Sequence, residues 1–529
     1  MYITEFAIGK RGKRMDDRKK LNKLAFWPAL VGLVIFLAAG VIFQEQVGEL
    51  LNTILYGMAD KVGWFFQIAV ILVIILTFVF AFSKFGNIRI GGPDAKPDYK
   101  TWNWITMSLC GGIGTGLLFW AMAEPIYHFM TPPVAAGVEA GSREAAIFAV
   151  SQTMWQWSVP QYCLYTICAV AFALVTYNMK KKLSFGPVLT TGIGKKGAKI
   201  ETFVHAVVIF CLCGAVANSM GVGLMQIGAG VESITGYPQS SMIWLVVAVI
   251  IGIVFISSSV SGIGNGLKKL SSFTTIVFIG ILIYVTIMGP AGFCANLGTE
   301  AFANLLDHPF EKTAILSTMA EGDSWPADWI IQYWASFIVY APILGMFLSR
   351  MAKGRTVRQF ILVNVLAPSI FCMIWIAVFG GLTINLQTTG AFDIWEGVNT
   401  TGMQSTIFYI LNTFPLGKIL IVVFVISIFT SFATMADPVA AALATISTRG
   451  LSVDDEAPNK LKIVIGVIMC AMAYILVASG GVNAIKGMWN IVGFPIAFLM
   501  FVVIISAFKN ASKCVKKKDN LVEEEEEME

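Results

Sequence analysis

Charged residues are scarce in this chain of 529 residues. Asp, Glu, Lys and Arg make up 13% of it, against about 25% in soluble proteins, while 57% of its residues are hydrophobic. So few charged side chains could not cover the surface of one water-soluble core of this size. The composition excludes a soluble enzyme, an intrinsically disordered chain and a nucleic-acid-binding domain. It predicts a protein that crosses a membrane several times.

Motifs of energy conversion and metal chemistry are also absent. There are 3 His, and the 9 Cys form no CxxC pair of the kind that binds metals. The chain has no GxxxxGK[ST] loop for ATP phosphates, no HExxH zinc motif and no TVGYG filter. These absences favour a secondary transporter without cofactor or bound metal. A channel, which needs a continuous polar lining, and a membrane enzyme, which needs convergent His, Glu or Asp, are the alternatives.

Long hydrophobic runs are abundant. About 20 apolar residues are needed for a helix to cross the hydrocarbon core of a bilayer. Twelve such runs predict an all-α polytopic membrane protein with twelve transmembrane helices. The runs are 24–43, 63–82, 104–129, 145–177, 203–228, 242–260, 270–288, 329–348, 360–384, 419–447, 463–479 and 489–508.

Basic residues lie on one side of these spans. If the N-terminus is cytoplasmic, all but five of the 37 Lys and Arg fall in the two tails and the cytoplasmic connections. The exceptions are Lys61, Arg143, Lys312, Lys418 and Lys486. Since Lys and Arg accumulate on the cytoplasmic side, the distribution predicts a multi-pass protein of the plasma (inner) membrane with both termini in the cytoplasm.

The segments outside the spans have distinct compositions. Residues 1–23 form a basic N-terminal tail, and residues 24–103 hold the first two helices. The connection 290–328 contains EAFANLLDHPFEKTAIL, which predicts an amphipathic helix at the outer membrane surface. The tail 509–529 ends in KKKDNLVEEEEEME, and such a block of charge predicts a solvated, disordered segment.

The third span is rich in glycine. Gly111, Gly112, Gly114 and Gly116 lie within six residues, at a cost of about 1 kcal/mol each relative to Ala in a helix. One interpretation is an unwound helix whose free main-chain groups face a substrate, because irregular backbone in a membrane must line protein or a cavity. The other is close packing of helices through small residues. The irregular spacing favours unwinding.

Two aromatic stripes lie within spans, each beside a helix breaker. In the fourth span, Trp157, Tyr162 and Tyr165 fall within one arc of a helix that Pro160 is expected to kink. In the eighth span, the stripe is Trp334, Phe337 and Tyr340, followed by Pro342 and Gly345.

Aromatic faces of this kind suit a quaternary ammonium ion. Such a cation has no N–H to donate, so carboxylates and carbonyls lose their hydrogen-bonding advantage, whereas each aromatic face contributes about 0.5–2 kcal/mol. The same arrangement would admit other compact cations, so the stripes leave the ligand class open.

Few ionisable residues lie inside the spans. They are Glu124, Asp437, His128 and His205. Asp437 is interpreted either as part of a kinked helix near an ion site or as a helix cap. Glu124, before Pro125, is expected to bind backbone amides. The two His are expected to pack without acidic neighbours at helical spacing.

Longer stretches of the chain resemble one transporter family. GGIGTGLLFWAMAEPIYHFMTPP, WSVPQYCLY, SGIGNGLKKLSS and YWASFIVYAPILGMFLSRMAKGRTVRQF together are similar to the betaine/carnitine/choline transporter (BCCT) family over almost the whole length. The resemblance implies two inverted five-helix repeats, spans 3–7 (104–289) and spans 8–12 (329–508), preceded by two extra helices. It also implies broken third and eighth spans, a midplane site, an outer amphipathic helix at 300–318 and a homotrimer.

The resemblance also implies a set of binding residues. The aromatic box would comprise Trp157, Tyr162, Tyr165, Phe337 and Tyr340, beside Trp334 and Ser336, with the substrate carboxylate at main-chain groups of Gly112, Gly114 and Gly116. Two adjacent Trp are usual in the eighth span, where this chain has Ser336 and Phe337. The box therefore has fewer indoles, which indicates weaker ammonium binding and a substrate that is larger than glycine betaine or not a simple trimethylammonium.

Ion coupling departs from the sodium-coupled relatives. The positions that would hold sodium are Cys110, Ile113 and Thr434, but Met435 stands where a serine hydroxyl is expected, and a thioether is a poor ligand for a hard cation. Sodium-independent exchange and cation-coupled symport therefore both remain. We expect a transporter, and no enzyme, for betaine-type zwitterions such as glycine betaine, carnitine or a related compound. Transport of another small amine or zwitterion is the alternative.

Overall fold

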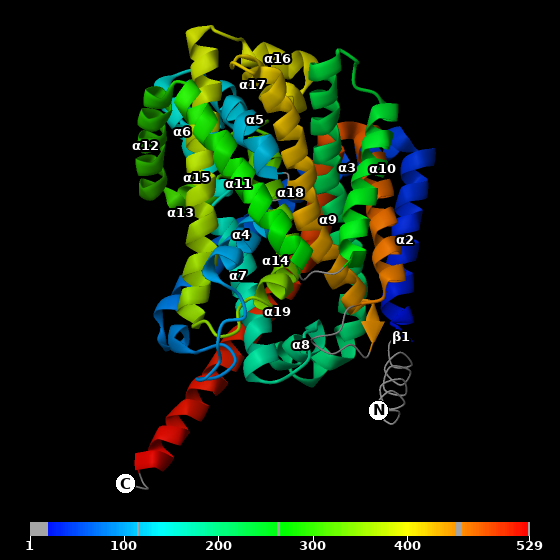
Figure 1. Ribbon diagram of the computed structural model, residues 1–529, viewed down its shortest axis with the longest axis vertical. Coiled ribbons are helices and arrows are strands. Elements are labelled where there is room, and N and C mark those ends of the chain that lie inside the picture. Colours follow the sequence, from blue (N-terminus) through cyan, green and yellow to red (C-terminus); the bar gives the residue numbers. More distant parts are fainter. Residues whose placement is uncertain (1–19, 114–115, 262–264, 450–456, 527–529) are drawn as a thin grey trace, which may run out of the picture.

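The protein is a bundle of long helices. The computed structural model describes residues 20–113, 116–261, 265–449 and 457–526 (Figure 1). The first strand, β1 (Lys20–Leu21), pairs antiparallel with β2 (Thr448–Arg449) at one end of the bundle. The C-terminal part of the last helix projects from that same end (Figure 1). The described ends of the chain thus lie on one side, which requires an even number of crossings.

Helices account for nearly all other regular structure. The α-helices are α2 (Lys23–Ile42), α3 (Gln44–Phe82), α4 (Thr101–Ile113), α5 (Gly116–Met130), α6 (Arg143–Gln156), α7 (Val159–Ala173), α8 (Phe185–Ile193), α9 (Lys195–Thr235), α10 (Ser241–Ser261), α11 (Asn265–Met288), α12 (Ala291–Asp307), α13 (Pro309–Thr313), α14 (Gln332–Ser349), α15 (Val357–Thr389), α16 (Ile394–Thr401), α17 (Thr406–Asn412), α18 (Gly417–Ile446) and α19 (Asn459–Glu526). Short 3₁₀ or π segments are η1 (Lys84–Asn87), η2 (Val134–Ala136), η3 (Leu174–Asn178), η4 (Ala327–Ile331) and η5 (Met403–Ser405).

The expected membrane spans are present as helices. Within the described residues, 11 helices are long and apolar enough to cross a membrane. The third expected span corresponds to α4 and α5, on either side of residues 114–115, which lie outside the described residues. The last helix, α19, supplies two spans, separated where Gly481 has a φ of +56°. The all-α membrane architecture is confirmed, while twelve spans and inverted repeats stay predictions.

Burial separates central from peripheral helices. Every side chain of α14 is buried, as are nearly all of those in α7. By contrast, α2, α10 and α11 expose large apolar side chains such as Trp27, Ile253 and Ile283. Continuous apolar exposure of this kind suits contact with lipid. The site must therefore be sought around α7 and α14.

The breaks in the fourth and eighth spans differ from expectation. The fourth span is interrupted between α6 and α7, and Pro160 lies in the first turn of α7, where its missing N–H costs no hydrogen bond. The eighth span was expected to be broken, but η4 and α14 form one helix that continues through Pro342. That expectation was wrong, because neighbouring helices pack on all sides of α14 and retain its helical path.

Two segments outside the spans are helical. In α12, the buried side chains Cys294, Leu297, Ala301 and Leu305 recur on one face, as expected for the amphipathic stretch. Its location at the outer membrane surface stays a prediction. The tail 509–529 is not a disordered segment as far as it is described, because α19 continues to Glu526. Lys and Glu, which dominate this stretch, are good helix formers.

Candidate functional site

One buried cavity lies among α5, α7, α9 and α14, with single residues of α4, α18 and α19 at its wall. The centres of water-sized molecules can occupy about 50 Å³ of it, against roughly 10–15 Å³ for a single water. The predicted binding residues that line it are Gly112, Gly116, Trp157, Tyr165, Ser336, Phe337 and Tyr340. It is also lined by Met435, which the sequence analysis considered only as an ion position, and by Trp120, Gln161, Ser219, Val222, Tyr333, Leu344 and Trp489, which the sequence analysis missed. The two aromatic stripes therefore meet at one chamber.

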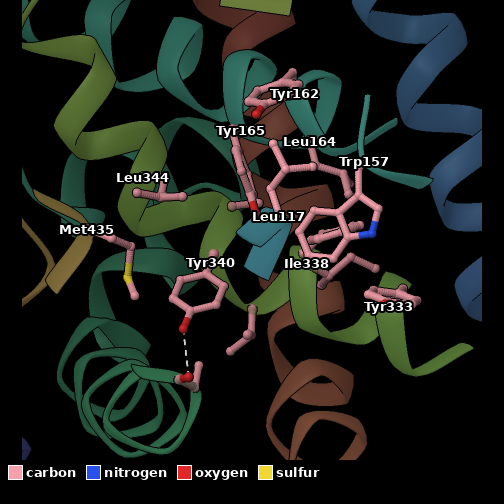
Figure 2. Packing of buried hydrophobic residues seen from close by; sticks show 14 of the residues in the cluster. Leu117, Trp157, Tyr162, Leu164, Tyr165, Tyr333, Ile338, Tyr340, Leu344 and Met435 are labelled. Atoms are coloured by element: carbon pink, nitrogen blue, oxygen red, sulfur yellow. Dashed lines mark hydrogen bonds between the residues drawn. The ribbon is translucent and has the colours of Figure 1, made fainter. Parts of the chain in front are cut away.

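Trp157 lies at the break between α6 and α7. It follows the last residue of α6, and its ring packs edge-on against Tyr333 and Phe337, with centroids 5.4 and 5.6 Å apart. Figure 2 shows this ring opposite Tyr165 and Tyr340, with the indole nitrogen pointing away from both. The hydroxyl of Tyr340 donates to the carbonyl of Ala215 in α9 at 2.6 Å. These contacts hold the rings around the cavity from three helices.

The glycines of the third span allow the rings to approach. A Cβ on Gly116 would lie 2.5 Å from Trp157 Cη2, and one on Gly112 would lie 2.6 Å from Tyr162 Cε1. Gly112 is helical, so close packing describes it better than unwinding does. Gly114 lies outside the described residues. Close packing therefore applies at Gly112 and Gly116, while unwinding of the glycine run stays a prediction.

Two members of the predicted box do not line the cavity. The hydroxyl of Tyr162 lies 3.5 Å from Cys372 Sγ, behind Tyr165. Trp334 donates its indole N–H to the carbonyl of Thr313 at 3.1 Å. Tyr333 takes the place expected for Trp334. The spacing i, i+4, i+7 of Tyr333, Phe337 and Tyr340 is the better match to one helix face and could have identified it.

The predicted ion ligands are engaged in protein contacts. Cys110 Sγ lies 3.3 Å from Thr275 Oγ1, and the Thr434 hydroxyl donates to the carbonyl of Ser431 at 2.8 Å. Ile113 ends α4, and its side chain is outside the described part of the structure. The described residues contain no group of three His, Cys, Asp or Glu side chains that could hold a metal.

Asp437 connects two helices of the bundle. Its Oδ2 accepts a hydrogen bond of 2.8 Å from the Ser258 hydroxyl in α10, while α18 continues past it. The contact is between helices, so Asp437 does not act simply as a helix cap.

Glu124 is bound to side chains, not to backbone amides as expected. Its Oε2 accepts hydrogen bonds from Trp157 Nε1 and from the Tyr333 hydroxyl, both at 2.9 Å. Its Oε1 lies 3.2 Å from His128 Nε2. The expectation that neither His has an acidic neighbour at helical spacing was also wrong, because His128 follows Glu124 by four residues and His205 follows Glu201 by four. The carboxylate therefore stands behind two rings of the cavity.

Comparison with known proteins agrees with this architecture. A family model described as "BCCT, betaine/carnitine/choline family transporter" matches residues 24–516. The chain belongs to this family. BCCT membership makes it a multi-pass membrane transporter and not an enzyme.

Three BCCT relatives differ in the substrates that their names give. The chain is 30% identical over 506 residues to the ectoine/hydroxyectoine transporter of Virgibacillus pantothenticus, covering 95% of this chain and 99% of the relative. It is 29% identical to a probable glycine betaine transporter of Desulfitobacterium hafniense, with 94% and 98% covered. It is 28% identical to the betaine/ectoine transporter LcoP of Corynebacterium glutamicum, with 93% and 78% covered.

Proposed function

We propose that this protein is a secondary transporter of compact zwitterions with a quaternary ammonium head, such as glycine betaine, carnitine or a related compound. The observation that carries the proposal is the buried chamber enclosed by Trp157, Tyr165, Phe337 and Tyr340. An onium ion that leaves water there exchanges hydration for aromatic faces at about 0.5–2 kcal/mol each. A chamber lined mainly by apolar and aromatic side chains, in place of a continuous polar lining, supports alternating access over channel conduction.

The anionic end of the substrate has candidate partners at the same cavity. Gly116, the first described residue of α5, lines the cavity, and its main-chain amide is one candidate donor. The Trp489 indole N–H also lines the cavity, and no acceptor for it is present among the described residues. We place the substrate carboxylate between these donors.

Coupling takes one of two forms in this proposal. Met435 lines the cavity where a hydroxyl would favour sodium, which supports sodium-independent exchange of one substrate for a related product. Symport with sodium or another cation is the alternative. We further propose that the protein forms a homotrimer in the plasma membrane. Both termini are placed in the cytoplasm, because the basic residues concentrate on the side of the termini.

A second candidate substrate is a zwitterion that carries N–H groups, of the ectoine type. Gln161 lines the cavity, and its Oε1 accepts no hydrogen bond from the described residues. A quaternary ammonium has no N–H to offer this oxygen, whereas a cyclic amidine has. The relative that transports ectoine makes this candidate specific enough to test.

Uptake into proteoliposomes tests the proposal. Labelled glycine betaine, carnitine, choline and ectoine are supplied with and without sodium, and with each compound preloaded inside. Saturable uptake of at least one of them is expected, and dependence on preloading without dependence on sodium would establish exchange. Uptake that never saturates, or no uptake of any of the four, would refute the proposal.

Substitutions assign the uptake to the cavity. Trp157→Ala and Tyr340→Ala should each weaken the apparent affinity for substrate. Trp27→Ala should not, because Trp27 is 51% exposed on the surface of the bundle and does not line the cavity. Equal effects of all three substitutions would contradict the box assignment.

A further inference from the structure

Among the described residues, Glu124 is the only member of its hydrogen-bond cluster that carries a carboxylate, and it is fully buried beside the cavity. Its relative exposure is 0%, and it is held by side chains from three parts of the chain. A buried carboxylate is costly unless hydrogen bonds satisfy it. Ordinary packing could be achieved without that cost, so the position of this charge calls for a role in binding.

The hydrogen bonds show which form Glu124 takes. Trp157 Nε1 can only donate, and it bonds Oε2 at 2.9 Å, as the Tyr333 hydroxyl also does. The Trp325 indole N–H donates to His128 Nδ1 at 3.2 Å, so that ring nitrogen is an acceptor. The proton of a neutral imidazole is then on Nε2, which faces Glu124 Oε1 at 3.2 Å. Both carboxylate oxygens therefore act as acceptors, the role of an ionised carboxylate.

Among the described residues, other charges near this cluster leave that of Glu124 uncancelled. Lys486, within electrostatic reach of Glu124, has its Nζ 3.5 Å from Asp328 Oδ1, and this pair offsets itself. His128 is neutral in the arrangement above. The negative charge of Glu124 therefore acts on the rings in front of it.

Resting on the proposed function, we propose that Glu124 determines the preference of the aromatic box for a cation, by polarising Trp157 and Tyr333 from behind. A carboxylate that accepts the N–H of an indole or the O–H of a phenol pushes electron density into the ring, and its own field adds to that of the π face. In Figure 2 the Trp157 nitrogen points away from Tyr165 and Tyr340, so the charge lies on the far side of the ring from the chamber. Glu124 is thus a positioning and specificity-determining residue that does not line the cavity itself.

The test compares two ligands that differ only in charge at the head. Glycine betaine and 3,3-dimethylbutanoate share a carboxylate and three methyl groups, but the second has carbon in place of nitrogen. Glu124→Gln keeps one carbonyl oxygen for both ring donors, which bind the same oxygen. Its amide N–H2 replaces the acceptor that faces His128 Nε2, a loss that acts on both ligands alike, so the ratio of their affinities still reports the charge. Equilibrium binding to the purified full-length protein gives the ratio of the two affinities. We expect this ratio to fall about fivefold to tenfold in Glu124→Gln.

Gln226→Leu is the matched control. Gln226 is buried and donates to the carbonyl of Leu118 in α5 at 2.9 Å, so its loss loosens the same helix without changing a charge. The ratio should be unchanged in this variant even if both affinities fall. An equal loss of both affinities in Glu124→Gln, with the ratio preserved, would show a merely structural role and overturn the proposal.

A second variant decides the matter if Glu124→Gln does not fold. Tyr333→Phe keeps the ring and the carboxylate but removes one donor, and it should lower the ratio about twofold to threefold. An unchanged ratio in this folded variant would count against polarisation. If the native protein itself binds both ligands equally, the cation box of the proposed function fails. If the native protein prefers the cation and both variants keep the native affinity ratio, the cation box stands and the role of Glu124 is refuted.

Discussion

Gly116→Ala tests whether the wall of the cavity is as tight as the structure indicates. The added Cβ would lie 2.5 Å from Cη2 and 2.8 Å from Cζ3 of Trp157. Carbon atoms are optimally separated by about 3.5–4.0 Å, so the indole would have to retreat by about 1 Å. It cannot do so freely, because Glu124 holds its nitrogen at 2.9 Å and Tyr333 and Phe337 make edge-on contacts with its ring.

The magnitude follows from the cost of overpacking. Such insertions typically cost about 1–3 kcal/mol, which corresponds to about a 5–150-fold rise in Kd when the ring moves into the chamber. Scintillation-proximity binding of labelled glycine betaine to purified protein measures it. Gly280→Ala is the matched control, since nothing lies within 4 Å of its added Cβ.

A double variant separates the clash from a general effect of Ala. In Gly116→Ala/Trp157→Phe the outer atoms of the indole are gone. Gly116→Ala should therefore cost less affinity in the Trp157→Phe background than in the native protein. Native affinity in Gly116→Ala would refute the reasoning, as would full additivity in the double variant.

Three further predictions concern stability. Tyr340→Phe removes a donor to the Ala215 carbonyl and should lower stability by about 1 kcal/mol in a thermal melt, while Kd changes less than about threefold because the ring remains. Burial lowers the pKa of Lys312 to about 8. Between pH 8 and 10 the unfolded chain therefore binds more protons than the folded protein, and the stability of the native protein should rise with pH. Lys312→Met should raise Tm at pH 7 relative to the native protein and lose this advantage by pH 10. A Tm gain that persists at pH 10 would contradict the titration. Arg143→Ala should change stability by less than about 1 kcal/mol, because its 2.6 Å pair with Glu300 is largely exposed.

Much of the fold could be predicted from the order of residues alone. Hydrophobic length specifies a membrane helix, since every backbone group in lipid must find its partner within the helix. The runs at 24–43 and 242–260 accordingly match α2 and α10 within a few residues. The C-terminal tail was misjudged because its charge pattern suggested solvation, while the helix propensity of Lys and Glu favours continuation of α19.

Part of the candidate site could be predicted from the sequence. Trp157, Phe337 and Tyr340 stand out because aromatic side chains beside helix breakers are unusual within spans, and they do meet at one cavity. Trp120 and Trp489 carry no comparable local signal, since their place at the cavity depends on how α5 and α19 pack.

The sequence by itself determined the all-helical membrane architecture and two halves of an aromatic box, because both depend on local periodicity and on the solvent around each helix. Only the tertiary structure decided what stands behind the box. Glu124 receives its donors from residues 33 and 209 positions away, Trp157 and Tyr333, and contacts at such separations depend on the crossing of helices. The contact of Glu124 with His128, four residues along the same helix, is the one part of that cluster that the sequence spacing could have predicted.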